Sequence, residues 1–135
     1  MYTCSNNSAT YSNFAFEVSM TINQGDCGGL TIRGNSDNSN FYLFRMCQNG
    51  SYVLSKYTSN SSAVVLTGGK SSAINQGTNV IAVVANGSSF ELYINKQQVD
   101  SVSDGTYSQG SIGLIADAHN SQTVVTYQNA RVWTI

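Results

Sequence analysis

Short runs of β-branched and aromatic residues recur along the whole chain, and many of them alternate with polar residues in a period of two. Asn-Gly, Gly-Gly and Asp-Gly pairs separate these runs, proline is absent, and helical periodicity is hard to find. The pattern predicts strands near 14–22, 28–34, 41–47, 51–58, 63–66, 79–85, 89–95, 98–103, 110–116 and 123–133, and surface loops at 35–40, 58–62 and 67–78. We therefore expect an all-β fold, an antiparallel β-sandwich of two packed sheets.

Two Asn-Gly pairs predict tight hairpins, because a two-residue type I′ turn needs two residues that tolerate positive φ. With Gln48 opposite Ser51, the first hairpin pairs Met46 with Val53. The second pair, Asn86-Gly87, places Val83 opposite Phe90. Because side chains alternate between the faces of a strand, the second hairpin gives one core face, made of Ile81, Val83, Phe90, Leu92 and Ile94.

The register also extends to the strand at 28–34 if Arg33 pairs with Phe41. One face of the three strands then belongs to the core and carries Leu30, Ile32, Tyr42, Phe44, Met46, Val53 and Tyr57. The other face carries Thr31, Arg33, Phe41, Leu43, Arg45, Tyr52, Leu54 and Lys56. An ordinary exposed face would be rich in Ser and Thr, whereas this one mixes three of the six basic residues with rings and aliphatic groups. We interpret it as a candidate binding surface, although packing against a further strand or subunit would explain it equally well.

The same register places Cys27 directly opposite Cys47, within disulfide reach for a closely spaced pair. We predict a Cys27–Cys47 disulfide, with two small buried thiols as the alternative. Cys4 remains. Either its partner lies upstream of Met1 or it is free, since an odd cysteine in an exported protein suggests a missing partner.

The composition excludes several classes of function. The 135 residues correspond to one domain (1–135), with six Lys+Arg, seven Asp+Glu and a net charge of −1. This balance excludes nucleic-acid or membrane-surface binding by clustered basic charge, and no apolar run is long enough to insert into a membrane. The first residues lack the features of a signal peptide, so we expect an excised domain of an extracellular or cell-surface protein, whose export signal lies outside these residues.

Catalytic and metal-binding patterns are weak. The two Glu residues, Glu17 and Glu91, lie in separate strands, and the single histidine, His119, follows Asp117 in a loop. We expect no enzyme; a sugar hydrolase using Glu17, Glu91 or Asp117 with His119 is the least favoured interpretation. The 35–40 loop alternates side-chain oxygens as calcium loops do but lacks their closing glutamate, so we expect no metal or other cofactor, with calcium as a minor alternative.

An ordered series of motifs supports a family resemblance. The series includes Phe14-Ala-Phe16, Gly28-Gly-Leu-x-Ile-Arg33, Phe41-Tyr-x-Phe-Arg45, Gly110-x-Ile-Gly-Leu114 and Asn129-Ala-Arg-Val-Trp133. It resembles the concanavalin-like (laminin-G-like) jelly-roll superfamily, near three-keto-disaccharide hydrolase-like domains and the C-terminal sensor-like domains of bacterial membrane serine/threonine kinases. The resemblance implies two curved antiparallel sheets, with sugars often held on the concave face. The kinase-linked domains also imply an additional N-terminal segment that carries a partner for Cys4. The hydrolytic activity of some members does not transfer, because their acidic groups are not found here.

We therefore expect a non-catalytic, lectin-like carbohydrate-binding module of a secreted or surface-displayed bacterial protein, with a glycan as its partner. Phe41 and Tyr52 would stack on sugar rings, while Arg33, Arg45 and Lys56 would donate hydrogen bonds. Glu91 and Tyr93 would extend the groove if their hairpin lies in the same sheet. The alternative is a structural sandwich for adhesion or assembly that uses this face, in self-association or against an upstream segment.

Overall fold

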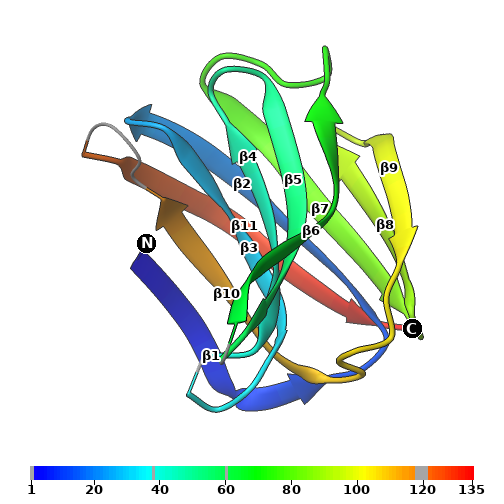
Figure 1. Ribbon diagram of the computed structural model, residues 1–135. Helices are drawn as coiled ribbons and strands as arrows, with labels where there is room; N and C mark the ends of the chain where they lie inside the picture. Colours follow the sequence, from blue (N-terminus) through cyan, green and yellow to red (C-terminus); the bar gives the residue numbers. More distant parts are fainter. Residues whose placement is uncertain (1, 38, 60, 118–121) are drawn as a thin grey trace.

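The computed structural model describes residues 2–37, 39–59, 61–117 and 122–135, and these residues form eleven strands and no helix. Sheet A contains, in spatial order, β1 (Tyr2–Tyr11), β10 (Gly110–Asp117), β3 (Cys27–Gly34), β4 (Phe41–Cys47), β5 (Ser51–Thr58) and β6 (Ser61–Lys70). Sheet B contains β11 (Val124–Thr134), β2 (Phe14–Gln24), β7 (Thr78–Asn86), β8 (Ser89–Ile94) and β9 (Gln97–Ser103). The two sheets pack face to face as separate layers (Figure 1). The predicted antiparallel β-sandwich is thus confirmed.

The alternating pattern of β2 explains why the core forms between the sheets. Every second side chain of this strand is buried, and the same holds along β7 and β8. The core face predicted for the second hairpin is confirmed, because all five of its residues are fully buried. Its register differs by two residues, with Ala85 opposite Phe90 and Val83 opposite Leu92. A shift of two residues leaves each side chain on its predicted face.

The register predicted for the first hairpin is wrong by one residue. Met46 lies opposite Tyr52, because the loop spans three residues, from Gln48 to Gly50. The N–H of Gly50 donates to the carbonyl of Cys47 at 3.1 Å, and Gly50 has a φ of 89°. An odd shift turns each side chain of β5 to the opposite face. The side chains of Tyr52, Leu54 and Lys56 therefore point toward sheet B, while those of Val53 and Tyr57 lie on the outer face of sheet A.

Arg33 also departs from its predicted place on an open face. It is the next-to-last residue of β3, has a left-handed φ of 53° and is only 2% exposed. Its guanidinium donates to the carbonyls of Gly87 (2.7 Å), Tyr107 (3.1 Å) and Ser12 (2.6 Å) and lies 5.2 Å from the ring centroid of Phe90. Arg33 thus joins three loops at one end of the sandwich, and its guanidinium is buried there instead of lying on the outer face.

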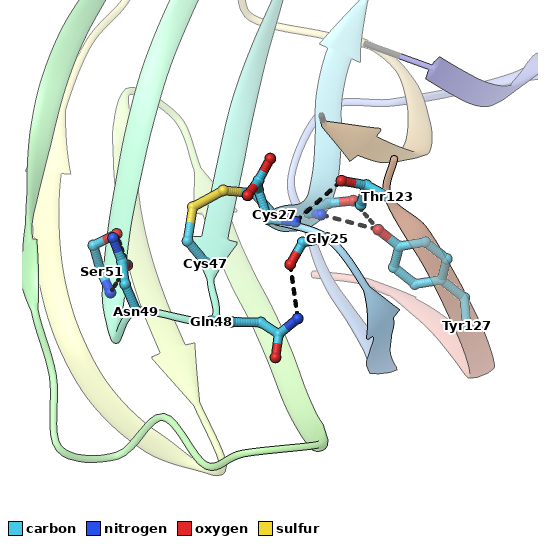
Figure 2. Close-up of a disulfide and its surroundings, with 10 residues drawn as sticks. Gly25, Cys27, Cys47, Gln48, Asn49, Ser51, Thr123 and Tyr127 are labelled. Carbon is cyan, nitrogen blue, oxygen red and sulfur yellow. Dashed lines mark hydrogen bonds between the residues drawn. A yellow bond between two sulfur atoms is a disulfide. The ribbon is translucent and has the colours of Figure 1, made fainter. Parts of the chain in front are cut away.

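The predicted register between β3 and β4 is confirmed, and so is the predicted disulfide. Cys27 pairs with Cys47 at a Cα–Cα distance of 4.1 Å, and the two residues form a disulfide (Figure 2). Cys4 lies in β1 opposite Leu114, and its side chain is outside the described part of the structure, so its partner stays a prediction. The predicted strands do not include β1, which is rich in Asn and Ser and extends sheet A by pairing with β10.

Tyr127 joins the two sheets beside the disulfide (Figure 2). It comes from β11 in sheet B, and its hydroxyl accepts a hydrogen bond from the N–H of Gly29 at 2.9 Å. The same hydroxyl can donate its own hydrogen to the carbonyl of Gly29 or of Ile115. Burial raises the pKa of Tyr127 to about 12, so the hydroxyl stays protonated. Gly28 leaves room for it, since a Cβ there would lie 3.0 Å from the tyrosine oxygen.

Candidate functional site

The outer face of sheet A carries a groove that crosses β3, β4, β5 and β6. Arg45 stands in its middle, because the strand register sets Gly29 on one side of it and Val53 on the other, with Gly68 beyond Val53. Two adjoining hollows of about 440 Å³ and 320 Å³ make up the groove, and both are lined by Arg45, Cys47 and Ser51. We call this the Arg45 groove.

The larger hollow of the Arg45 groove is mostly apolar. Val53 and Val65 line it, and Val65 on the edge strand β6 is 65% exposed. Gly68 and Gly69 keep its floor low. A Cβ at Gly68 would come within 2.8 Å of the carbonyl oxygen of Tyr52, so a side chain there would clash with the backbone.

The smaller hollow has a polar rim that is held in place by hydrogen bonds around the disulfide (Figure 2). Gln48 donates from its side chain to the carbonyl of Gly25 at 2.8 Å, and from its N–H to the carbonyl of Asp26 at 3.0 Å. Asn49 accepts from the N–H of Ser51 at 3.0 Å and from its hydroxyl at 2.6 Å. These bonds fix the loop that separates β4 from β5, so amide and hydroxyl groups line a pre-shaped edge.

A small hydrophobic cluster continues the outer face beside the Arg45 groove. Phe41, Leu43 and Ile115 are buried there, and Tyr57 packs against them. The rings of Phe41 and Tyr57 stack with centroids 4.7 Å apart and an interplanar angle of 12°. Phe41 lies on the predicted face, but its ring is covered rather than open to solvent. Tyr57, which sequence reasoning assigned to the core, is the more exposed of the two rings.

Tyr52 and Lys56, two further residues predicted to bind a ligand, instead connect the sheets. The hydroxyl of Tyr52 is the donor toward two acceptors, the carbonyl of Val99 and the carboxylate of Asp100, each at 3.2 Å. Lys56 donates to Asp104 at 3.2 Å and forms an ion pair with it. The predicted stripe of Arg33, Arg45, Tyr52 and Lys56 on one open face is therefore wrong, and Arg45 is the member that remains on the outer face.

Asp104 is the centre of this network between the sheets. Its carboxylate accepts from the hydroxyl of Tyr42 at 2.7 Å, the N–H of Thr106 at 3.0 Å and the ammonium of Lys56. Burial acts to raise the pKa of Asp104, but the hydrogen bonds from Tyr42, Thr106 and Lys56 outweigh it and hold that pKa well below its usual range. Burial, with the bond to Asp104, raises the pKa of Tyr42 to about 12.

The lowered pKa of Asp104 predicts a pH dependence. A carboxylate whose pKa is lower in the folded state stabilises the fold above its unfolded pKa of ~3.9, and this stabilisation disappears as the pH falls through the folded value. We expect Asp104→Asn to melt below the wild-type protein at pH 7, with the gap closing as the pH falls below about 4. Thermal melts of both proteins between pH 2.5 and pH 7 measure this; a gap that stays constant would contradict it.

Glu91 and Tyr93 lie on the other side of the molecule from the Arg45 groove. Both belong to β8 in sheet B, and the hydroxyl of Tyr93 donates to Glu91 at 3.2 Å. Their hairpin is thus not in the same sheet as Arg45, so the expected extension of the groove is wrong. Glu17 lies in β2 of sheet B as well. The side chain of Asp117 and the whole of His119 lie outside the described residues.

No group of three or more His, Cys, Asp and Glu residues is placed to hold a metal within the described part of the chain. In the 35–40 loop, Asn35 accepts hydrogen bonds from the N–H groups of Ser39 (2.9 Å) and Asn40 (3.0 Å). Asp37 accepts from the hydroxyl of Ser39 at 2.7 Å. These oxygens therefore shape a turn. Among the described residues no helix has the length and apolar character of a membrane span.

Comparison with known proteins places the fold. No protein-family model matches the chain, and no curated protein matches it. A carbohydrate binding module (CBM66) from Bacillus subtilis superposes with a TM-score of 0.80 at 27% identity, over 93% of this chain and 77% of that one. Chicken galectin 2 superposes at 0.69 and 13% identity, over 98% of each chain. The chain is a jelly-roll β-sandwich. A putative glycosyl hydrolase from Parabacteroides distasonis shares the fold at 0.69 and 11% identity, over 95% of this chain and 81% of that one.

Proposed function

We propose that this jelly roll is a non-catalytic carbohydrate-binding module whose sugar lies in the Arg45 groove. The observation that carries the proposal is the combination of a solvent-open groove on one sheet with structural similarity to a carbohydrate binding module at 27% identity. The similarity to galectins, at lower identity, supports the fold on which such a site is built.

The chemistry of the Arg45 groove suits a sugar. Sugar rings have apolar C–H faces, which Val53 and Val65 would cover, and hydroxyl edges, which need donors and acceptors. Arg45 lines both hollows, and a guanidinium is a planar group that can donate to two vicinal oxygens. The amides of Gln48 and Asn49 supply further polar groups at the rim. With a net charge of −1, the chain provides no strong field to concentrate a charged ligand.

The proposal also includes the location of the protein and the families to which it is most similar in its motifs. A disulfide in a domain of this size is typical of oxidising compartments, which supports a secreted or surface-displayed protein. The resemblance of the motifs to three-keto-disaccharide hydrolase-like domains and to kinase-linked sensor domains adds a bacterial origin and an upstream partner segment for Cys4.

Replacing Arg45 tests the site. We expect Arg45→Ala to weaken binding to the best glycan of an array by at least about tenfold, because a bidentate, charge-assisted contact is lost. Arg131→Ala is the matched control, since Arg131 is exposed on sheet B, and it should bind as the wild type does. Repeating the array with a chelator tests the calcium alternative. Equal binding by both variants, with melting temperatures unchanged, would place the sugar elsewhere.

One observation favours assembly as a second candidate function. Val64 and Val65 are 51% and 65% exposed on β6, which is an edge strand of sheet A. Exposed apolar edge strands pair readily with other chains. A dimer that forms with increasing protein concentration, together with a silent glycan array, would favour assembly over sugar binding.

A further inference from the structure

A second cleft lies on the outer face of sheet B, and we propose that it is a separate binding site for a neutral sugar ring. It has a volume of about 300 Å³, at the lower end of the range of small-ligand sites. Its lining includes Trp133, Tyr93, Glu17, Lys96, Ala15 and Ala82. We call it the Trp133 cleft. It shares a ligand class with the proposed function but none of the residues of the Arg45 groove, so the module would bind glycans on both faces.

A β-bulge directs Trp133 into this cleft. Tyr127 and Met20 are paired and face the core, and from Arg131 onward β11 pairs with β2 one residue out of step. Asn129 has a φ of 57° within the bulge. The extra residue reverses the alternation, so Val132 packs against the core while Trp133 points outward and is 46% exposed. Without the bulge, Trp133 would face the same side as Tyr127; bulges often re-aim a side chain in this way.

Two alanines hollow the sheet between the aromatic side chains. Trp133 is paired with Ala15, and Tyr93 is paired with Ala82. Because β11, β2, β7 and β8 are consecutive neighbours, the outer two strands are about 14 Å apart at ~4.8 Å per spacing. Trp133 and Tyr93 therefore form opposite walls of a shallow cleft with a low floor, wide enough for a flat ring to stack against the indole.

Lys96 occupies a rigid rim of the Trp133 cleft. Asn95 and Lys96 form the turn between β8 and β9 with φ values of 52° and 68°. The side chain of Asn95 donates to the carbonyl of Ala73 at 2.7 Å and to Asn79 at 2.8 Å, and it accepts from the N–H of Val80 at 2.9 Å. Two of these bonds hold the turn against β7 and the third holds it to the loop before β7, so the backbone of Lys96 has a fixed position.

The charges of the cleft suit a neutral ligand rich in hydroxyl groups. Glu17 lines it, and Glu91 lies one strand from its floor beside Tyr93. These are the only glutamates of the chain. Their carboxylates accept hydrogen bonds from hydroxyls, and Lys96 donates. Arg131, opposite Glu17 in the register, balances the charge. Because Lys96 and Arg131 offset the two carboxylates, the cleft has no net charge to attract an ionic ligand, whereas a neutral sugar ring meets acceptors, a donor and an aromatic face.

Trp133 is the only tryptophan of the chain, so its fluorescence reports on this cleft and not on the Arg45 groove. The experiment titrates the full chain with neutral oligosaccharides of glucose, galactose and mannose, recording Trp emission and calorimetric stoichiometry. We expect one sugar to change the emission saturably in the wild type and in Arg45→Ala. Ala82→Leu fills the floor but keeps the reporter, and it should weaken the emission response at least about tenfold. Ala63→Leu, the same substitution at an exposed alanine on β6 of sheet A, is the matched control and should leave the emission response unchanged.

The outcomes separate this inference from the proposed function. Emission that no sugar of the panel changes, or that responds equally in Ala82→Leu of unchanged melting temperature, overturns the second site even if the Arg45 groove binds. Emission that depends on protein concentration without sugar also overturns it, because another copy of the chain would then cover Trp133. Weaker binding of Arg45→Ala to the best glycan of the array, together with an intact emission response, supports both sites.

Discussion

Replacing Arg33 with methionine is expected to lower the free energy of unfolding by about 3–5 kcal/mol. The guanidinium is almost fully buried and donates to three backbone carbonyls from loops at 12, 87 and 107. Methionine keeps much of the side-chain length but removes every donor. The carbonyls that lose their partners each cost roughly 1–3 kcal/mol if they stay dry, and the contact with the Phe90 ring is lost as well.

Urea denaturation followed by circular dichroism measures this effect. Arg131→Met is the matched control, because Arg131 is exposed, and it should change the free energy of unfolding by less than about 0.5 kcal/mol. If Arg33→Met were as stable as the control, Arg33 would not join the three loops. Arg33→Lys should recover only part of the loss, since one ammonium cannot replace the geometry of a planar fork.

Replacing both Cys27 and Cys47 with serine is expected to cost about 3 kcal/mol of unfolding free energy. The disulfide closes a loop of 20 residues in sequence separation, and releasing it increases the conformational entropy of the unfolded chain. The same bond lines the polar hollow of the Arg45 groove, so sugar binding should also weaken.

Thermal melts of the double variant and of the wild type with a reducing agent measure this effect. Cys4→Ser is the control, because Cys4 does not take part in the Cys27–Cys47 disulfide. The reduced wild type and the double variant should melt at similar, lower temperatures. An unchanged melting temperature in the double variant would mean that the fold does not depend on this bond.

The two hairpins show how far sequence could predict the site. Alternation of apolar residues identified the strands, and the face of β7 and β8 survived a register error because the error was even. For β4 and β5 the error was odd, so two of the seven predicted ligand residues, Tyr52 and Lys56, lie on the opposite face from the predicted one. An Asn-Gly pair signals a tight turn but does not decide whether the loop contains two residues or three. The additional loop residue turns the side chains of Tyr52 and Lys56 toward sheet B.

Backbone irregularities explain why the positions of Arg33 and Trp133 were not predicted. The left-handed conformation of Arg33 turns its side chain inward, and no local sequence pattern identifies a non-glycine residue as left-handed at that position. The bulge at Asn129 turns Trp133 outward. The sequence pattern predicted a strand at 123–133 and supported the family resemblance there, but it assigned no face to Trp133. Strict alternation from Tyr127 to Trp133 would place both rings on the same face of β11. The bulge places them on opposite faces instead.

Mapping backbone amide shifts by NMR during titration with the best glycan of the array tests the central claim most directly. Binding in the Arg45 groove predicts that the largest saturable shifts arise at Arg45, Val53 and Gly68 and in the 48–51 turn. Amides of the Trp133 cleft should titrate with an affinity of their own. A glycan that shifts neither the amides around Arg45 nor their neighbours on β5 and β6 would contradict the account.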